Sequence, residues 1–259
     1  MKTHRKAQVV LAALLLLAAG GWMWTSLVGP GVNMTQAAQQ FLDTLSEEQQ
    51  AEAVMPFDGS PRLGWHFIPK DDRKGLQVKN MDEAQKEAAF KLLSSALSQV
   101  GYKKSRQIME LEAILHELEK DQPGGNIRDP QRYYFTIFGD LESKWGLSVE
   151  GHHLSLNFVV DDGQVVAHTP AFLGANPAEV KSDVGVVPPK GTRTLAKEED
   201  LAFKLLNSFD DSQRSLVVIA DKAPREMRAA GEPHAPDAAP EGLAAKDMNE
   251  SQLRTLWAL

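Results

Sequence analysis

The side chains best suited to chemistry in this chain are concentrated in residues 145–177. This stretch contains Glu150 and three of the seven histidines, His152, His153 and His168. Imidazole and carboxylate groups exchange protons near neutral pH and coordinate divalent metals. We therefore expect Glu150, His152 and His153 to be the catalytic residues of any enzyme built here, with His152 and His153 as the first candidates for binding a divalent metal.

A hairpin signal determines which of these side chains can meet. Asp162-Gly163 lies between two apolar runs, a pattern typical of a two-residue turn. Such a turn would place Asn157 opposite His168. Because side chains alternate along a regular strand, one face would carry Glu150 and His152 among apolar residues, and the other would carry His153, Asn157 and His168.

This geometry limits the metal site. His152 and His153 point apart on a regular strand, so one ion reaches both only if the strand bulges at Gly151. His153 and His168 would lie on the order of 13 Å apart, too far to share an ion. Glu150 with His152 supplies only two of the three or four ligands that a metal needs. The alternative is that His152 is a buried histidine bonded to Glu150.

Two further functions stay open alongside a metal-dependent enzyme. In a ligand-binding or interaction module without catalysis, Tyr133, Tyr134 and Trp145 would line a pocket, and Asn157 and His168 would orient a small-molecule or envelope ligand. In a structural envelope protein, the histidines would only form hydrogen bonds within the core. The loop at residues 168–177 is either part of a site or a turn that starts a helix near Ala178.

A helix-start pattern recurs four times in the body of the chain. An apolar residue, a cap, an acid and, after one further residue, a glutamine occur around the caps Ser46, Asp82, Asp210 and Asn249. The cap and the glutamine form a capping box, and the acid favours the positive end of the helix dipole. The first and third matches extend upstream, which indicates either an internal duplication or convergence of good caps.

The remaining periodicity predicts an α+β fold, an antiparallel sheet with a hairpin at about 145–168 packed with several helices. Apolar residues at helical spacing follow the second cap, and Gly101 is a natural stop. Further helices are expected at about 103–120 and 197–206, with a strand at 133–138 between them.

The N-terminus indicates where the body resides. The positive segment MKTHRK precedes an apolar run, so residues 1–31 are a signal peptide or a membrane anchor through residues 9–28. Either places the body, a single α+β domain at 32–259, outside the cytoplasm, periplasmic or secreted.

Composition excludes other classes of function. The net charge is −7, and the basic runs are short, so we expect no nucleic-acid partner. There is no cysteine, which excludes disulfides and thiolate chemistry.

Several ordered motifs resemble a known bacterial family, domain of unknown function 3500 (DUF3500). They run from about Gln39 to the end and comprise Arg132-Tyr133-Tyr134, Phe138-Gly139, Trp145-Gly146, Glu150-Gly151-His152-His153-Leu154-Ser155-Leu156-Asn157, Thr169-Pro170, Phe172 and Gly174-Ala175-Asn176-Pro177. The resemblance implies no activity or cofactor. It implies a further histidine-containing segment, so the apolar ending Leu256-Trp257-Ala258-Leu259 predicts a truncated product that lacks half of a bipartite site.

Overall fold

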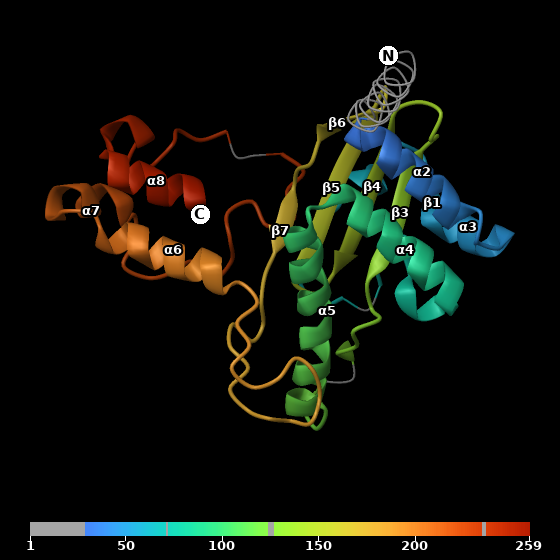
Figure 1. The fold of residues 1–259 in the computed structure, drawn as a ribbon, viewed down its shortest axis with the longest axis horizontal. Helices are drawn as coiled ribbons and strands as arrows, with labels where there is room; N and C mark the ends of the chain where they lie inside the picture. Colours follow the sequence, from blue (N-terminus) through green and yellow to red (C-terminus); the bar gives the residue numbers. More distant parts are fainter. Residues whose placement is uncertain (1–28, 71, 124–126, 235–236) are drawn as a thin grey trace, which may run out of the picture.

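The computed structural model describes residues 29–70, 72–123, 127–234 and 237–259 (Figure 1). Within them, seven strands form one open, mostly antiparallel sheet, in which β1, β3, β4, β5 and β6 are neighbours in that order. In addition, β2 pairs with β3, and β7 pairs with β5. The strands are β1 Val54–Met55, β2 Leu76–Gln77, β3 Tyr134–Gly139, β4 Trp145–Gly151, β5 Leu154–Asp161, β6 Gln164–Ala167 and β7 Ala171–Leu173. The predicted α+β class is confirmed.

Helices lie before and after the sheet in the sequence. They are α2 Pro30–Leu42, α3 Glu47–Ala53, α4 Glu83–Ala96, α5 Gln99–Glu119, α6 Ala196–Asn207, α7 Asp211–Val217 and α8 Glu250–Ala258. Short 3-10 turns are η1 Ser60–Arg62, η2 Val78–Asn80 and η4 Ala245–Asp247. Figure 1 shows α2 to α5 packed beside the sheet, whereas α6, α7 and α8 gather apart from it.

All four predicted capping boxes are present. Ser46, Asp82, Asp210 and Asn249 each accept a bond from the amide of the glutamine three residues on, whose side chain returns to the cap amide. These reciprocal bonds satisfy amides that the first helical turn otherwise leaves unpaired. The predicted stop at Gly101 is wrong, because Ser98 caps α5 by accepting from the Gly101 amide. Glycine here belongs to the first turn of a helix. The helix expected near Ala178 is also absent, since the next helix begins at Ala196.

The two faces of the sheet are covered differently. One face buries Phe135, Ile137 and Leu147 in a core shared with Phe41 of α2 and Leu92 of α4. The opposite face carries small or polar side chains that are nevertheless buried, namely Thr136, Ser148, Glu150 and Ser155. Residues 56–75 cover part of this second face, because Lys74 bonds Glu150, and Trp65 with Phe138 lines a small cavity there.

The hairpin is built differently from the prediction. The stretch expected as one strand is divided into β4 and β5, with Gly151 paired to Leu154 and His152-His153 as the turn between them. His153 has a φ of 58°, a left-handed conformation that histidine adopts more readily than most residues. The Asp162-Gly163 turn is confirmed by the pairing of Val160 with Val165.

A register shift moves His168 away from its expected partner. Val159 pairs with Ala167 across an irregularity between Val159 and Val160. Asn157 therefore does not face His168, which lies beyond the end of β6 and is exposed. The extra residue of a bulge shifts all later pairs by one position.

No helix of the described residues is long and apolar enough to cross a membrane. The predicted signal or anchor at 1–31 falls almost wholly on residues 1–28, outside the described part.

Candidate functional site

The Gly-His-His turn is held in place by loops on both sides. The His153 amide donates to the Phe67 carbonyl at 2.8 Å, and the His153 carbonyl accepts from the Gly174 amide at 2.8 Å. Such bonds satisfy both backbone groups of the left-handed residue, which stabilises a conformation that is otherwise uncommon. The turn therefore places two imidazoles in a fixed position at the end of the sheet.

His152 forms a buried pair with a carboxylate of α5. Its Nδ1 lies 2.5 Å from Oε1 of Glu112, and the two residues are 8% and 4% exposed. The Arg128 guanidinium lies against the same ring, with Nη1 3.2 Å from Nδ1 and 3.4 Å from Nε2. The Tyr133 hydroxyl donates to the His152 carbonyl at 2.8 Å. A carboxylate on one ring nitrogen selects the tautomer with its proton there, which leaves the other nitrogen basic.

His153 is neutral in the folded protein. Burial, then the neighbouring His152 and Arg128, lower its pKa from 6.5 to about 4. Its ring contacts that of His152 with centroids 4.2 Å apart, and its buried Nδ1 has no hydrogen-bond partner among the described residues. A Cβ at Gly174 would lie 2.7 Å from this nitrogen, so only glycine fits there.

Glu150 belongs to a separate cluster, which corrects the expected pairing with His152. It bonds Lys74 Nζ at 2.7 Å and lies 3.8 Å from Arg73 Nη1, all three side chains being almost fully buried. Burial lowers the pKa of Arg73 and of Lys74, and the Glu150 carboxylate opposes that effect. Arg73 also donates to the carbonyls of His66 and Ile68. The cluster fastens residues 64–74 onto the sheet.

Cationic side chains surround the His152 side of the turn. A small cavity there is lined by Pro69, Lys70, Arg73, Glu112, Ile127, Arg132 and His152. A neighbouring cleft of about 250 Å³ shares Lys70 and Arg73 and is also lined by Trp65, His66, Lys74 and the carboxylate Glu150. Burial and the cations Arg73 and Lys70 lower the pKa of His66. Lys70 and Arg73 therefore connect this cleft to the cavity beside the Glu112–His152 pair.

Two of the residues expected to contact a ligand line cavities, Trp145 one of about 410 Å³ and Asn157 one of about 80 Å³. Tyr133 and Trp145 are fully buried, and Tyr134 is 7% exposed. Trp145 donates to Thr35 Oγ1 at 3.0 Å, while Asn157 donates to the Pro170 carbonyl at 2.9 Å. Burial raises the pKa of Tyr133 well above its usual value.

The histidines alone do not complete a metal site. Among the described residues, no group of three or more histidine, cysteine, aspartate or glutamate side chains is arranged to hold an ion. His152 and His153 do lie together, as ring neighbours in a turn. A metal bound by both thus stays a prediction that needs further ligands.

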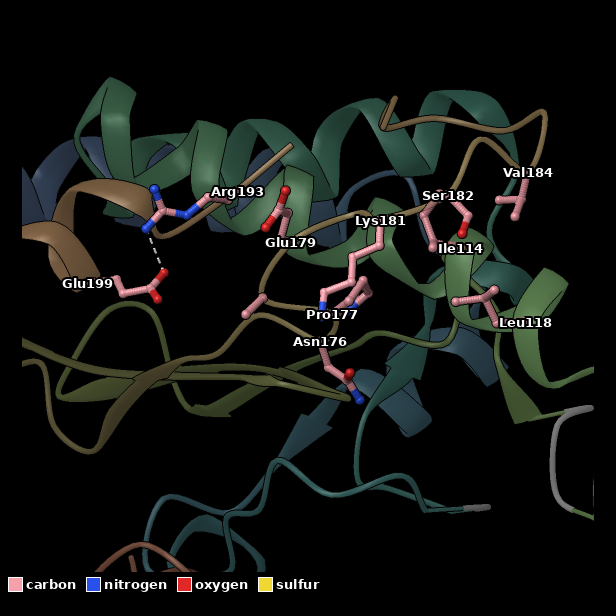
Figure 2. A pocket seen from close by; sticks show the side chains of 11 residues that line it. Ile114, Leu118, Asn176, Pro177, Glu179, Lys181, Ser182, Val184, Arg193 and Glu199 are labelled. Carbon is pink, nitrogen blue, oxygen red and sulfur yellow. Dashed lines mark hydrogen bonds and ion pairs between the residues drawn. The ribbon is translucent and has the colours of Figure 1, made fainter. Parts of the chain in front are cut away.

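A larger cavity of about 520 Å³ lies between α5 and the loop that follows β7 (Figure 2). Figure 2 shows Ile114 and Leu118 of α5 on one wall and Asn176, Pro177 and Lys181 of the loop on another. At its edge Arg193 bonds Glu199 at 2.7 Å. The cavity has the size of a small-molecule site, but neither Glu112 nor His152 lines it.

The sequence reasoning missed Glu112 and Arg128. Glu112 lies one turn after Ile108 and three residues before Leu115, so it shares the apolar face of α5. A carboxylate on the buried face of a helix needs a hydrogen-bond or charge partner, so the sequence could have indicated that Glu112 is paired. Arg128 lies outside the described helices and strands and gave no signal.

One protein family matches nearly the whole chain. Its description is "Protein of unknown function (DUF3500)", and the match covers residues 29–259. The chain belongs to the DUF3500 family. No curated protein and no solved structure gives a significant match. The DUF3500 assignment confirms the resemblance carried by the Gly-His-His motif and leaves the function to be inferred from the site.

Proposed function

We propose that this DUF3500 protein is an extracytoplasmic enzyme that binds a small anionic molecule beside the Gly-His-His turn. The Glu112–His152 pair is its acid–base group. The observation that carries the proposal is that a cavity of about 10 Å³ lined by His152 and Glu112 shares the cations Lys70 and Arg73 with a cleft of about 250 Å³, which has room for a small molecule. A proton-transfer group and a substrate-charge site are the two parts that general acid–base catalysis on an anion requires.

The chemistry follows from the hydrogen bond to Glu112. With Nδ1–H donating to the carboxylate, Nε2 carries the lone pair and accepts a proton from substrate. Arg128 lies against the ring, with Nη1 3.2 Å from Nδ1 and 3.4 Å from Nε2, and its Nε bonds Glu119 at 2.8 Å. This guanidinium therefore places a positive charge beside the base.

Thermal unfolding in the presence of inorganic phosphate and of citrate tests the binding step. These probes separate a preference for phosphate from one for carboxylate. A ligand at about 100 times its Kd stabilises the folded state by about 2.7 kcal/mol, a rise in Tm of several degrees. We expect this rise in the full-length protein and its loss in Lys70→Ala.

The control is His168→Ala, which removes an exposed histidine outside the site. It should retain the full ligand-induced rise in Tm. Equal rises in Lys70→Ala and the wild type would place the anion elsewhere and contradict the proposal.

One observation favours a metal centre as a second candidate. His153 Nδ1 is buried without a partner beside the His152 ring, and an unpaired buried nitrogen is costly unless something binds it. Metal analysis of the purified full-length protein and of His152→Ala and His153→Ala tests this. A stoichiometric metal lost in both variants supports it, and no metal in the wild type removes it.

The larger cavity of about 520 Å³ favours the alternative of a ligand-binding module without catalysis. Asn176 and Pro177 of the family motif line it. An apolar ligand that raises Tm in the wild type, but not in Leu118→Asp, would support this function.

The extracytoplasmic location rests on the positive N-terminus and the apolar run at residues 9–28. Fusion of this segment to a reporter that is active only outside the cytoplasm tests it.

A further inference from the structure

Two parts of this chain repeat the same arrangement of helices. In the first, α2 leads through Ser46 into α3, and after a long loop η2 leads through Asp82 into α4. In the second, α6 leads through Asp210 into α7, and after a long loop η4 leads through Asn249 into α8. We call residues 30–96 the first unit and residues 196–259 the second unit.

The two units share a bridge between glutamines far apart in sequence. In the first unit, Gln85 Nε2 donates to Gln49 Oε1 at 2.7 Å and to the Thr44 carbonyl at 2.9 Å. In the second unit, Gln252 Nε2 donates to Gln213 Oε1 at 2.9 Å and to the Ser208 carbonyl at 3.0 Å. The four glutamines occupy equivalent positions in the four capping boxes.

Smaller details of the two units also coincide. Gln49 Nε2 donates to the carbonyl two residues before Asp82, and Gln213 Nε2 donates to the carbonyl two residues before Asn249. The hydroxyls of Thr44 and Ser208 each donate three residues back, at 2.6 and 2.7 Å.

The sequence repeats as well. Gly75-Leu76-Gln77-Val78-Lys79-Asn80-Met81-Asp82-Glu83-Ala84-Gln85 matches Gly242-Leu243-Ala244-Ala245-Lys246-Asp247-Met248-Asn249-Glu250-Ser251-Gln252. Gly75 and Gly242 both have positive φ, 93° and 104°. Convergence of good caps explains neither the shared glycine conformation nor the glutamine bridges, so the units are copies of one element.

The first unit shows what this element binds. Val54 and Met55 pair with Ile137 and Phe138, and Leu76 pairs with Phe135, so β1 and β2 hydrogen-bond β3. On α4, the Phe90 ring contacts that of Phe135 with centroids 6.1 Å apart, and Leu92 is fully buried in the same core. The unit therefore covers one strand of the sheet, with backbone and apolar contacts together.

The equivalent face of the second unit is uncovered. Val218 and Ile219 correspond to Val54 and Met55, and they are 45% and 58% exposed. Trp257 and Leu259 correspond to Phe90 and Leu92, and they are 87% and 46% exposed. Among the described residues, no strand pairs with 218–219 or 243–244. Figure 1 shows α6, α7 and α8 of the second unit standing apart from the sheet.

We propose that the second unit is a docking site for a β-strand of the β3 type, presented by a partner polypeptide. Such a strand alternates large apolar side chains, as Phe135 and Ile137 do in β3, and offers a free edge to residues 218–219 and 243–244. Strand addition supplies backbone bonds for affinity, and side-chain pockets select the sequence. The first unit is the template for this interface.

Fragment complementation with the full chain tests the proposal. The probe is a synthetic peptide of residues 132–151, which spans β3 and β4, with Trp145 replaced by phenylalanine. The difference in tryptophan fluorescence between the wild type and Trp257→Phe gives the emission of Trp257 alone. We expect the peptide to shift this emission to the blue and to reduce its quenching by acrylamide.

Matched variants assign the contact. Ile219→Asp should weaken peptide binding at least tenfold, while Phe203→Asp should leave it unchanged, because Phe203 is exposed at a position equivalent to the exposed Gln39. A peptide with Phe135→Asp and Ile137→Asp should not bind. Absence of binding to the wild type, or equal binding to Ile219→Asp, would overturn the proposal. A dimer that Ile219→Asp dissociates would make a second copy of the chain the occupant and would also overturn it.

Discussion

Acidification should destabilise this protein through His153 before most carboxylates titrate. Burial favours the neutral ring in the folded state and lowers its pKa to about 4, whereas the unfolded chain takes up the proton near pH 6.5. Protonation thus favours unfolding. The contribution of the neutral ring is complete above about pH 6.5 and is lost as the pH falls toward 4.

The size of this effect follows from the difference between the two pKa values. Each pKa unit corresponds to about 1.4 kcal/mol, so the full difference amounts to about 3 kcal/mol. Because the ring keeps some contact with solvent, we expect a loss of about 2 kcal/mol between pH 6.5 and 4.

Urea denaturation of the wild type and of His153→Asn at pH 7, 5.5 and 4.5 measures this loss of stability. Asparagine tolerates the left-handed backbone at φ 58° and does not titrate, so it isolates the imidazole. As the pH is lowered, the free energy of unfolding of the wild type should fall by about 2 kcal/mol more than that of His153→Asn. Equal pH dependence in both proteins would refute the assignment of a buried neutral His153.

Three further sets of substitutions test the packing and charge assignments. Glu112→Ala leaves His152 without its carboxylate and should cost about 3 kcal/mol in urea denaturation, whereas Glu112→Gln should cost less. Gly174→Ala would bring a Cβ within 2.7 Å of His153 Nδ1 and should cost about 2 kcal/mol, while Gly64→Ala, whose nearest contact is 3.8 Å, should be close to neutral. Gln85→Ala should lower the free energy of unfolding of the whole protein by about 2 kcal/mol. Gln252→Ala should increase amide hydrogen exchange in α6 to α8 and leave that of the sheet unchanged. The same exchange pattern in both variants would contradict the view that the two units unfold independently.

Local rules predicted the helices well. The capping boxes at Ser46, Asp82, Asp210 and Asn249 depend on side chains within three residues of each other, so the sequence alone locates these helix starts. Gly101 misled because glycine also fits a first helical turn when a serine caps it.

The site was predicted only in part, because its contacts are long-range. The motif at 150–153 was recognised, but a left-handed histidine turned the expected strand into a hairpin. The partner of His152 is Glu112, 40 residues away, and that of Glu150 is Lys74, 76 residues away. Strand alternation says nothing about which distant segments cover a face of the sheet.

The most direct test of the proposed site is the protonation of His152 in the folded protein. Nitrogen NMR of protein labelled at histidine should show a proton on Nδ1 that is hydrogen-bonded to Glu112, and this proton should be lost from view in Glu112→Ala. Addition of phosphate or citrate should shift the Nε2 resonance of the wild type but not that of Lys70→Ala. A ring with Nδ1 unprotonated, or an Nε2 resonance that no binding anion moves, would contradict the Glu112–His152 pair as the acid–base group.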